Sequence, residues 1–307
     1  MAPNGVLLKM IYAPINPVDL DTISGSYPHV PTLPGIGGNE GVAKVLQVGP
    51  KTTKVKVGDL VLPSAFGFGT WRDYASCDES QVIAVPKVKD VKLEYLATLS
   101  IAPATAFRLL NDFVDLKEGD VIIQNGANGM VGLSVVQLAA ARGIKTINVI
   151  RRRSDYEELV ELIKSYGGYL VCGDDYIRTP EFRGIISDLP KPKLALSCAS
   201  TSSTELARLL SPGGTLVTYG GMSSKPITLP TSSFIFNDIT CKGFWINKWY
   251  ETQGVEKKQA LLEHLVELVE NKKLRLWVER HPFAEFDTAL YRAIRTTERS
   301  RKVLISF

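Results

Sequence analysis

The sequence is poor in residues that bind metal ions or form cystine bridges. Its 307 residues include three histidines, which lack ligand spacing to each other or to the cysteines: His29, His264 and His281. The four cysteines lie far apart and form no CxxC pair, so neither a zinc finger nor a redox dithiol is indicated. They are Cys77, Cys172, Cys198 and Cys241. Isolated cysteines are typical of a reducing compartment, either the cytosol or the mitochondrial matrix.

Long apolar runs and blocks of like charge are also missing. No apolar run approaches the roughly 18–20 residues that span a bilayer, and no charged or low-complexity tract suggests a nucleic-acid-binding arm. The net charge of +4 suits anionic small molecules such as nucleotides or acyl-CoA, but it is ordinary for a globular protein. Residues 1–17 lack the pattern of a transit or signal peptide. If the protein works in mitochondria, we therefore expect this chain to be a processed or shortened form.

The chain has two textures, and its length is ordinary for two domains. Residues 1 to about 100 combine short β-type runs with Gly and Pro turns, which predicts an irregular β domain. From about residue 118, strand and helix signals alternate as in a doubly wound parallel sheet. Strands are expected at 120–125, 145–150, 169–172, 193–198, 215–220, 239–244, 274–280 and 302–307. Helices are expected at 130–142, 155–166, 203–210, 254–272 and 286–296.

A glycine-rich turn lies between the first strand of this second region and its first helix. It reads Gln124-Asn125-Gly126-Ala127-Asn128-Gly129-Met130-Val131-Gly132. This is the strand–turn–helix context of the dinucleotide fingerprint, in which small residues and free N–H groups approach a pyrophosphate. Ala127 takes the place of the first fingerprint glycine. The alternative is a glycine-rich turn that binds no ligand.

The end of the next strand indicates which dinucleotide would bind. NAD-binding folds place Asp or Glu at this point for the ribose hydroxyls. Here the strand ends in Arg151-Arg152-Arg153, and no acid follows until Asp155. Guanidinium groups suit phosphate oxygens, so the sequence favours NADP over NAD. The alternative is a solvated basic loop.

These features together resemble the medium-chain dehydrogenase/reductase superfamily and, within it, the mitochondrial trans-2-enoyl-CoA reductases (2-enoyl thioester reductases). The resemblance covers nearly the whole chain, in the stretches 13–19, 25–28, 37–45, 69–75, 124–132, 147–153, 202–206, 213–222 and 243–245. It implies an α/β fold, with a Rossmann doubly wound parallel sheet domain and a GroES-like irregular β-barrel catalytic domain. The β domain would comprise residues 1–102 completed by 273–307, and the NADPH-binding domain residues 103–272.

The resemblance also bears on metal binding. Zinc alcohol dehydrogenases carry a His-Glu pair where this chain has Asn39-Glu40, and no cysteine ligand lies upstream. A catalytic zinc needs three protein ligands, so no metal is expected. Zinc-free members of the superfamily reduce polarised double bonds instead.

The chemistry of such a reduction needs a proton donor. Hydride from NADPH adds to the β-carbon of an α,β-unsaturated thioester, and hydrogen-bond donors stabilise the charge that moves to the thioester oxygen. The α-carbon then takes a proton, which a phenol can supply at neutral pH. The resemblance implies that Tyr27, in the loop Gly25-Ser26-Tyr27-Pro28, is this donor. From the residues alone, Tyr27 is one of eleven tyrosines and could serve packing. Trp71 and Trp245 could line an acyl tunnel or pack in the core.

The resemblance further implies a set of cofactor contacts. They are Asn128, Gly129, Met130, Val131, Arg151, Arg152, Arg153, Tyr219, Gly220, Gly221, Met222, Phe244, Trp245, Ile246, Asn247 and Lys302. From composition alone, the glycine stretches 218–222 and 243–245 could equally be strand-to-loop packing. The basic run 299–302 could be a solvated rim or could attract phosphate. The chain departs from the family at Ala102, where the family has an asparagine that contacts the cofactor, and we expect the late start to leave a sheet edge unpaired.

The leading hypothesis is NADPH-dependent reduction of trans-2-enoyl thioesters of CoA or acyl carrier protein, in fatty acid synthesis. The resemblance implies a homodimer in the mitochondrial matrix, although the chain alone also allows the cytoplasm. One rival function is a zinc-free quinone reductase, which shares the cofactor domain. Another is a non-catalytic NADPH-binding protein, which would bind the cofactor without turnover.

Overall fold

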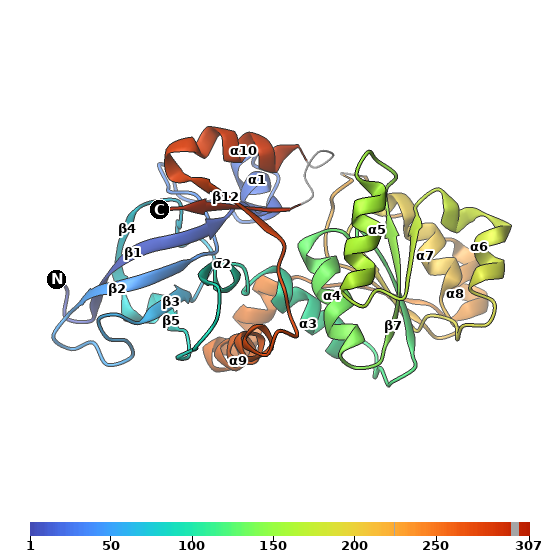
Figure 1. Ribbon diagram of the computed structural model, residues 1–307, viewed down its shortest axis with the longest axis horizontal. Coiled ribbons are helices and arrows are strands. Elements are labelled where there is room, and N and C mark those ends of the chain that lie inside the picture. The colour runs from blue at the N-terminus through green and yellow to red at the C-terminus, as the bar shows by residue number, and fades with distance from the viewer. Residues whose placement is uncertain (224, 296–300) are drawn as a thin grey trace. The chain divides into compact units, whose positions relative to one another are not determined.

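The chain folds into two units and contributes to the first of them twice (Figure 1). The computed structural model describes residues 1–223, 225–295 and 301–307. Unit 1 comprises Met1–Ala104 and Ile246–Phe307, and unit 2 comprises Thr105–Trp245. Each unit has its own sheet and its own apolar core.

Unit 1 is built on a largely antiparallel sheet with the order β12-β13-β1-β2-β3-β5 in its described residues, and β4 pairs with β1. The strands are β1 (Gly5–Pro14), β2 (Val42–Val48), β3 (Leu60–Pro63), β4 (Tyr74–Asp78), β5 (Val82–Ala84), β12 (Val278–Pro282) and β13 (Lys302–Ser306). Strand β1 pairs with β2 along one side, and with β4 and then β13 along the other. Alternate residues of β1, including Val6, Leu8 and Met10, are buried in the core, as expected of a strand with one covered face.

The helices of unit 1 cover parts of this sheet. They are α1 (Pro17–Ile23), α2 (Leu93–Leu96), α9 (Ile246–Glu270) and α10 (Phe286–Ile294), with 3₁₀ turns at Glu79–Gln81 and Phe283–Glu285. Helix α10 lies along β12 and β13 (Figure 1), and its Ala289 and Ala293 pack against Val303 and Ile305.

Unit 2 contains a parallel sheet with the order β11-β10-β9-β6-β7-β8 in its described residues. The strands are β6 (Val121–Asn125), β7 (Lys145–Ile150), β8 (Leu170–Gly173), β9 (Leu194–Ser197), β10 (Thr215–Thr218) and β11 (Thr240–Gly243). The chain order reverses between β6 and β9, as in the doubly wound dinucleotide-binding fold. Helices α4 and α5 lie on one side of the sheet, and α6, α7 and α8 on the other (Figure 1). The predicted α/β fold class is therefore confirmed.

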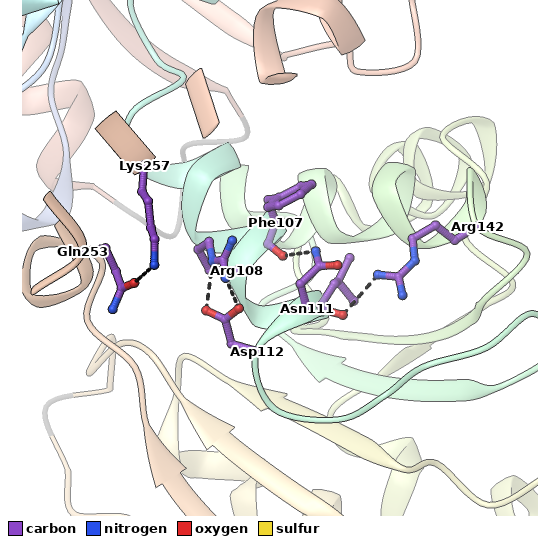
Figure 2. A network of polar contacts seen from close by, with 8 residues as sticks. Phe107, Arg108, Asn111, Asp112, Arg142, Gln253 and Lys257 are labelled. Carbon is purple, nitrogen blue, oxygen red and sulfur yellow. Dashed lines mark hydrogen bonds and ion pairs between the residues drawn. The ribbon is translucent and has the colours of Figure 1, made fainter. Parts of the chain in front are cut away.

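The helices of unit 2 are α3 (Ala102–Asn111, entering from unit 1), α4 (Met130–Ala140), α5 (Tyr156–Ser165), α6 (Pro180–Ile185), α7 (Ser203–Leu209) and α8 (Thr231–Asn237), with 3₁₀ turns at Tyr176–Arg178 and Ser200–Ser202. Figure 2 shows how the end of α3 is held. Arg142, just after α4, donates to the carbonyl of Leu110 at 3.1 Å (Figure 2). It also donates to the carbonyl of Leu116, beyond the helix, at 3.1 Å. Arg108 pairs with Asp112 one turn further along. The bond from Arg142 to Leu110 satisfies a carbonyl that the helix end leaves without a partner.

The end of the chain differs most from the sequence prediction. The helix predicted from Gly254 is found, because α9 consists of two helical stretches that meet at a break in helical geometry at Gly254, with φ 84°. The stretch from Ile246 to this break was not predicted. The predicted domain boundary assigned this segment to the nucleotide domain, whereas the structure groups it with unit 1. Its side chains explain this, because Lys258 donates to the carbonyls of Pro63 and Ser64 at 3.1 and 2.9 Å.

Other elements also differ, and helices α1, α2, α3, α6 and α8 were not predicted. The strand predicted at 274–280 begins only at Val278 and continues to Pro282. Strand β4, with the exposed Tyr74, was not predicted. The helix predicted at 286–296 is found as far as Ile294, and residue 296 lies outside the described residues.

Candidate functional site

The glycine-rich turn of unit 2 leaves no room for a side chain at Gly126 or Gly132. Gly126 has φ 58°, and a Cβ there would collide with the Sγ of Cys198. A Cβ on Gly132 would lie 2.6 Å from the Cα and the carbonyl oxygen of Ala127. The start of helix α4 therefore packs directly on the turn, as the last fingerprint glycine allows. Helix α4 has Gly129 as its N-cap, with no side-chain cap, so its first N–H groups are suited to an anion.

The predicted loop at 219–222 lies at the same sheet edge, joined to the turn through Cys198. Cys198 directly follows strand β9, and its N–H donates to Asn125 Oδ1 at 2.8 Å. The N–H of Met222 donates to the carbonyl of Cys198 at 2.9 Å, and that of Tyr219 to Ser197. The sequence reasoning missed Asn125 and Cys198, although each lies at the carboxyl end of a predicted strand.

The thiol and phenol at this edge are held in their neutral forms. Burial raises the pKa of the Cys198 thiol, which is hydrogen-bonded to the Tyr219 hydroxyl. Burial likewise raises the pKa of Tyr219 well above its usual value. The edge is thus lined by uncharged groups, and its positive charge comes from the arginines of the neighbouring loop.

The three consecutive arginines follow strand β7 and differ in their partners. Arg151 is exposed and forms no ion pair within the described parts of the chain. Arg152 pairs with Asp175 at 3.1 Å, and both side chains are more than half exposed. Arg153 pairs with Asp155 at 2.6 Å. An ion pair this exposed to solvent contributes little to stability, so Arg152 can exchange its partner for a phosphate, and Arg151 has no ion-pair partner in the described chain to give up.

The segment predicted at 244–247 crosses from unit 2 to unit 1. Phe244 packs edge-on against Phe113, with ring centroids 5.8 Å apart, and its N–H donates to the carbonyl of Thr218. Trp245 is 40 % exposed, whereas Ile246 is buried. Asn247 belongs to unit 1, where its amide donates to the hydroxyl of Tyr27 at 3.4 Å.

Tyr27 itself is held by two loops of unit 1. Its ring stacks on Phe66, with centroids 5.5 Å apart and an interplanar angle of 26°. Its backbone N–H donates to the carbonyl of Asp21 at 3.1 Å, at the end of helix α1. The structure therefore brings two predicted site residues, Tyr27 and Asn247, within hydrogen-bonding distance of each other. The phenol is partly buried.

A buried polar cluster of unit 1 includes Glu40, from the Asn39-Glu40 pair that stands where zinc dehydrogenases carry His-Glu. Glu40 accepts hydrogen bonds from Ser100 Oγ, the N–H of Ile101 and Asn16 Nδ2, at 2.8–3.0 Å. Lys302 donates to Asn16 Oδ1 and to the carbonyl of Ile15. In the described residues, no group of three or more His, Cys, Asp or Glu could hold a metal ion.

The carboxylates of this cluster are strongly perturbed. Burial raises the pKa of Asp19 to about 6, against the opposing effect of hydrogen bonds from Asn16 and Asn39. Burial also raises the pKa of Glu40, and the positive charge of Lys302 acts in the opposite direction. Burial thus favours the neutral forms of both carboxyl groups, and their hydrogen bonds and the charge of Lys302 oppose it.

Three further residues named in the sequence analysis pack or form hydrogen bonds inside the protein. Lys302 is only 8 % exposed and donates within unit 1, so its predicted cofactor contact stays a prediction. Residues 299 and 300 of the predicted basic run lie outside the described residues. Trp71 packs on Phe286, with centroids 5.1 Å apart, and donates to the carbonyl of Pro14. Ala102 is buried at the first position of α3.

Two family models match this chain, one in unit 1 and one mainly in unit 2. Residues 2–87 match the family model described as "Alcohol dehydrogenase GroES-like domain". Residues 131–261 match "Zinc-binding dehydrogenase". A curated relative from Dictyostelium discoideum, "Enoyl-[acyl-carrier-protein] reductase, mitochondrial", is 50 % identical over 302 residues, covering 98 % of this chain and 85 % of the relative. The Homo sapiens protein of the same name is 41 % identical, covering 97 % and 80 %.

Solved structures give the same result. The mitochondrial 2-enoyl thioester reductase Etr1p/Etr2p heterodimer from Candida tropicalis superposes with a TM-score of 0.93 at 31 % identity, covering 100 % of this chain and 92 % of that one. The Etr1p complex with NADP and crotonyl-CoA has the same TM-score, identity and coverage. An NADPH:quinone reductase from Bacillus thuringiensis, described there as putative, is more distant, with a TM-score of 0.84 at 27 % identity and coverage of 99 % and 90 %.

Proposed function

Because the chain belongs to the family of mitochondrial enoyl-[acyl-carrier-protein] reductases, we propose that it reduces trans-2-enoyl thioesters to saturated acyl thioesters with NADPH. The observation that carries this proposal is the phenol of Tyr27, which is partly buried and held between Phe66 and Asn247. A phenol in such a place can give up a proton and receive it back from solvent.

The residues of unit 2 fit NADPH. The uncapped start of α4 and the tight glycine turn suit the pyrophosphate, and Arg151 and Arg152 suit a 2′-phosphate. When bound, NADPH supplies the hydride that adds to the β-carbon of the enoyl thioester. We propose that NADPH contacts the cofactor residues named from the sequence. They are Asn128, Gly129, Met130, Val131, Arg151, Arg152, Arg153, Tyr219, Gly220, Gly221, Met222, Phe244, Trp245, Ile246, Asn247 and Lys302.

The role of Tyr27 follows from the charge that the reaction creates. Addition of hydride leaves negative charge on the thioester oxygen and the α-carbon, and the α-carbon must then be protonated. Tyr27 would donate this proton through its hydroxyl, and Asn247 Nδ2, which donates to the same oxygen, would stabilise the resulting phenolate. Protonation by a held side chain contributes roughly 10²–10⁴-fold to the rate of such steps.

We further propose that the thioester is carried by CoA or acyl carrier protein, that the protein acts in the mitochondrial matrix in fatty acid synthesis, and that it is a homodimer.

The homodimer is supported by the edge of the unit 2 sheet. All four residues of the edge strand β11 are exposed, and so are Ile235 and Phe236 on the preceding helix, at 67 and 79 %. An open edge of this kind can pair with the same edge of a second copy. Sedimentation should give a dimer, and Phe236→Asp should shift it toward monomer; a monomeric wild-type chain would contradict this part.

The rival function is quinone reduction, because the chain is also similar to the quinone reductase described above. NADPH absorbance would be followed with trans-2-hexenoyl-CoA and, separately, with a quinone. We expect oxidation of NADPH with the enoyl thioester, at a kcat/KM well above that with the quinone. Turnover of the quinone alone would overturn the proposal, and cofactor binding without turnover of either would indicate a non-catalytic protein.

A further inference from the structure

The amide of Asn39 joins the two loops of unit 1 that hold Tyr27. Its Nδ2 donates to Asp19 Oδ1 at 2.6 Å, and its Oδ1 accepts from the N–H of Gly67 at 2.8 Å. Asp19 lies on helix α1, which leads into the Tyr27 loop, and Gly67 directly follows Phe66. One side chain therefore connects the element before Tyr27 with the residue next to its stacking partner.

The connection between Asp19 and Tyr27 is short and made of backbone. The N–H groups of Ser26 and Tyr27 both donate to the carbonyl of Asp21, at 2.9 and 3.1 Å. The hydroxyls of Ser24 and Ser26 bond to that same carbonyl. The turn from α1 to Tyr27 is thus fixed to the helix, so a shift of α1 would shift the phenol.

The connection on the other side passes through the aromatic stack. Gly67 N–H is held by Asn39, and the ring of the adjacent Phe66 stacks on Tyr27. The backbone of this loop is also fixed to the Asn39 segment, because Gly69 and Thr70 donate to the carbonyl of Gly38 at 3.0 Å. The contacts form a closed ring that runs from Asn39 through both loops to Tyr27.

The ring needs at this place a side chain that both donates and accepts a hydrogen bond, and an amide does both. Ionised Asp19 can only accept a hydrogen bond and the N–H of Gly67 can only donate one, so the side chain between them must do both. A carboxylate would face Asp19 as a like charge, and an apolar residue would leave both partners unsatisfied. The position that carries a histidine in zinc dehydrogenases thus carries here a group suited to bridging two loops.

We propose that Asn39 is a positioning residue for the proton donor, which aligns Tyr27 by tying helix α1 to the Phe66 loop; this rests on the proposed role of Tyr27. The isosteric change Asn39→Leu removes both hydrogen bonds. A misplacement of about 1 Å can cost on the order of 100-fold in rate, so we expect kcat for trans-2-hexenoyl-CoA to fall about 10- to 100-fold. The KM for NADPH should change less than about twofold, because the cofactor residues of unit 2 are untouched.

A double-mutant cycle with Tyr27→Phe separates positioning from a general structural role. If Asn39 acts through the phenol, Asn39→Leu should change kcat by less than about twofold in the Tyr27→Phe background. Equal losses in both backgrounds, or no loss in the wild-type background, would overturn the proposal. The matched control is Asn111→Leu, since the amide of Asn111 bonds only to Phe107 of its own helix among the contacts in the described chain. It should leave both values unchanged.

Two measurements keep the test decisive if Asn39→Leu folds poorly or the proposed function fails. In Asn39→Asp, the new carboxyl and that of Asp19 can share a proton at low pH, which restores a donor between them. At higher pH both carboxyls ionise and repel each other. The other charged groups that act on Asp19 are Glu40 and Lys302. The kcat of Asn39→Asp relative to wild type should therefore be higher at pH 6 than at pH 8, and a constant ratio would overturn the proposal. Independently of turnover, 3-fluorotyrosine at position 27 should give a sharp ¹⁹F resonance that Asn39→Leu broadens or splits, whereas an unchanged resonance would contradict it.

Discussion

The two units present their polar groups in opposite ways. Unit 1 brings polar side chains together in one hydrogen-bonded cluster of Asn16, Asp19, Asn39, Glu40 and Lys302. Unit 2 offers backbone N–H groups at a tight turn and arginines that are exposed or weakly paired. The first arrangement holds one group in one place, which suits chemistry. The second provides positive charge and close approach, which suits a large anionic cofactor. Substitutions should therefore lower the rate in unit 1 and the cofactor affinity in unit 2.

The largest effect is expected at Tyr27. Tyr27→Phe keeps the stack on Phe66 but removes the hydroxyl, so the rate of enoyl thioester reduction should fall about 10²–10⁴-fold. The affinity for NADPH should be unchanged, because unit 2 is intact. Steady-state kinetics and fluorescence titration with NADPH would measure both values, with Tyr74→Phe, on the exposed face of β4, as the control. Full activity in Tyr27→Phe would remove Tyr27 as the acid.

The next effect concerns stability. It tests whether burial of the ionised Asp19 carboxylate lowers the free energy of unfolding. Folded Asp19 keeps its proton up to about pH 6, whereas an ordinary Asp loses it near 3.8. The folded state binds more protons in this window, so the contribution of Asp19 to stability falls as pH rises through it. A shift of this size corresponds to about 3 kcal/mol.

Asp19→Asn removes this pH dependence. The free energy of unfolding of the variant, minus that of wild type, should therefore rise between pH 4.5 and 7.5, as measured by urea denaturation. Asp120→Asn in unit 2 is the matched control, because a backbone hydrogen bond from Lys117 lowers the pKa of Asp120 below its ordinary 3.8. Its pH dependence therefore falls below this window, and the difference should stay flat between pH 4.5 and 7.5. A difference that stays flat for Asp19→Asn would show that the cluster does not perturb this carboxyl.

Cofactor preference should depend on Arg151. Hydrogen bonds to charged groups contribute about 1.5–3 kcal/mol, so Arg151→Ala should weaken NADPH binding on the order of 10- to 100-fold. Binding of NADH, which lacks the 2′-phosphate, should be unaffected. Titration of both cofactors gives the ratio, and Arg183→Ala, an exposed arginine on α6, is the control. Equal losses for NADPH and NADH would assign Arg151 to another part of the cofactor.

The smallest effect is expected at the glycine turn. In Gly132→Ala the new Cβ meets the backbone of Ala127 at 2.6 Å, so the start of α4 must move. Overpacking of this kind costs about 1–3 kcal/mol, and NADPH affinity should fall because the first N–H groups of the helix shift. Gly184→Ala, on α6 with nothing within 4 Å of the new Cβ, should change neither value. Unchanged NADPH binding in Gly132→Ala would argue against the pyrophosphate at this turn.

The same contrast explains what could be predicted from the sequence. The cofactor edge of unit 2 depends on local signals, since strand, glycine turn and helix are consecutive, and 145–150 was predicted with the bounds observed. The site of unit 1 depends on residues far apart in the chain. The sequence shows that Asn39 replaces a histidine, but only the fold shows that its amide lies between Asp19 and Gly67. The placement of α9 depends likewise on the distant contacts of Lys258.

The division of labour between the units is tested most directly by the fate of two hydrogens. Trans-2-hexenoyl-CoA would be reduced in ordinary water with NADPH dideuterated at C4 of the nicotinamide, and the product analysed by ²H NMR. The account predicts deuterium at the β-carbon and none at the α-carbon, because the α-hydrogen comes from the exchangeable hydroxyl of Tyr27. Deuterium at the α-carbon, or no transfer from NADPH at all, would contradict the account.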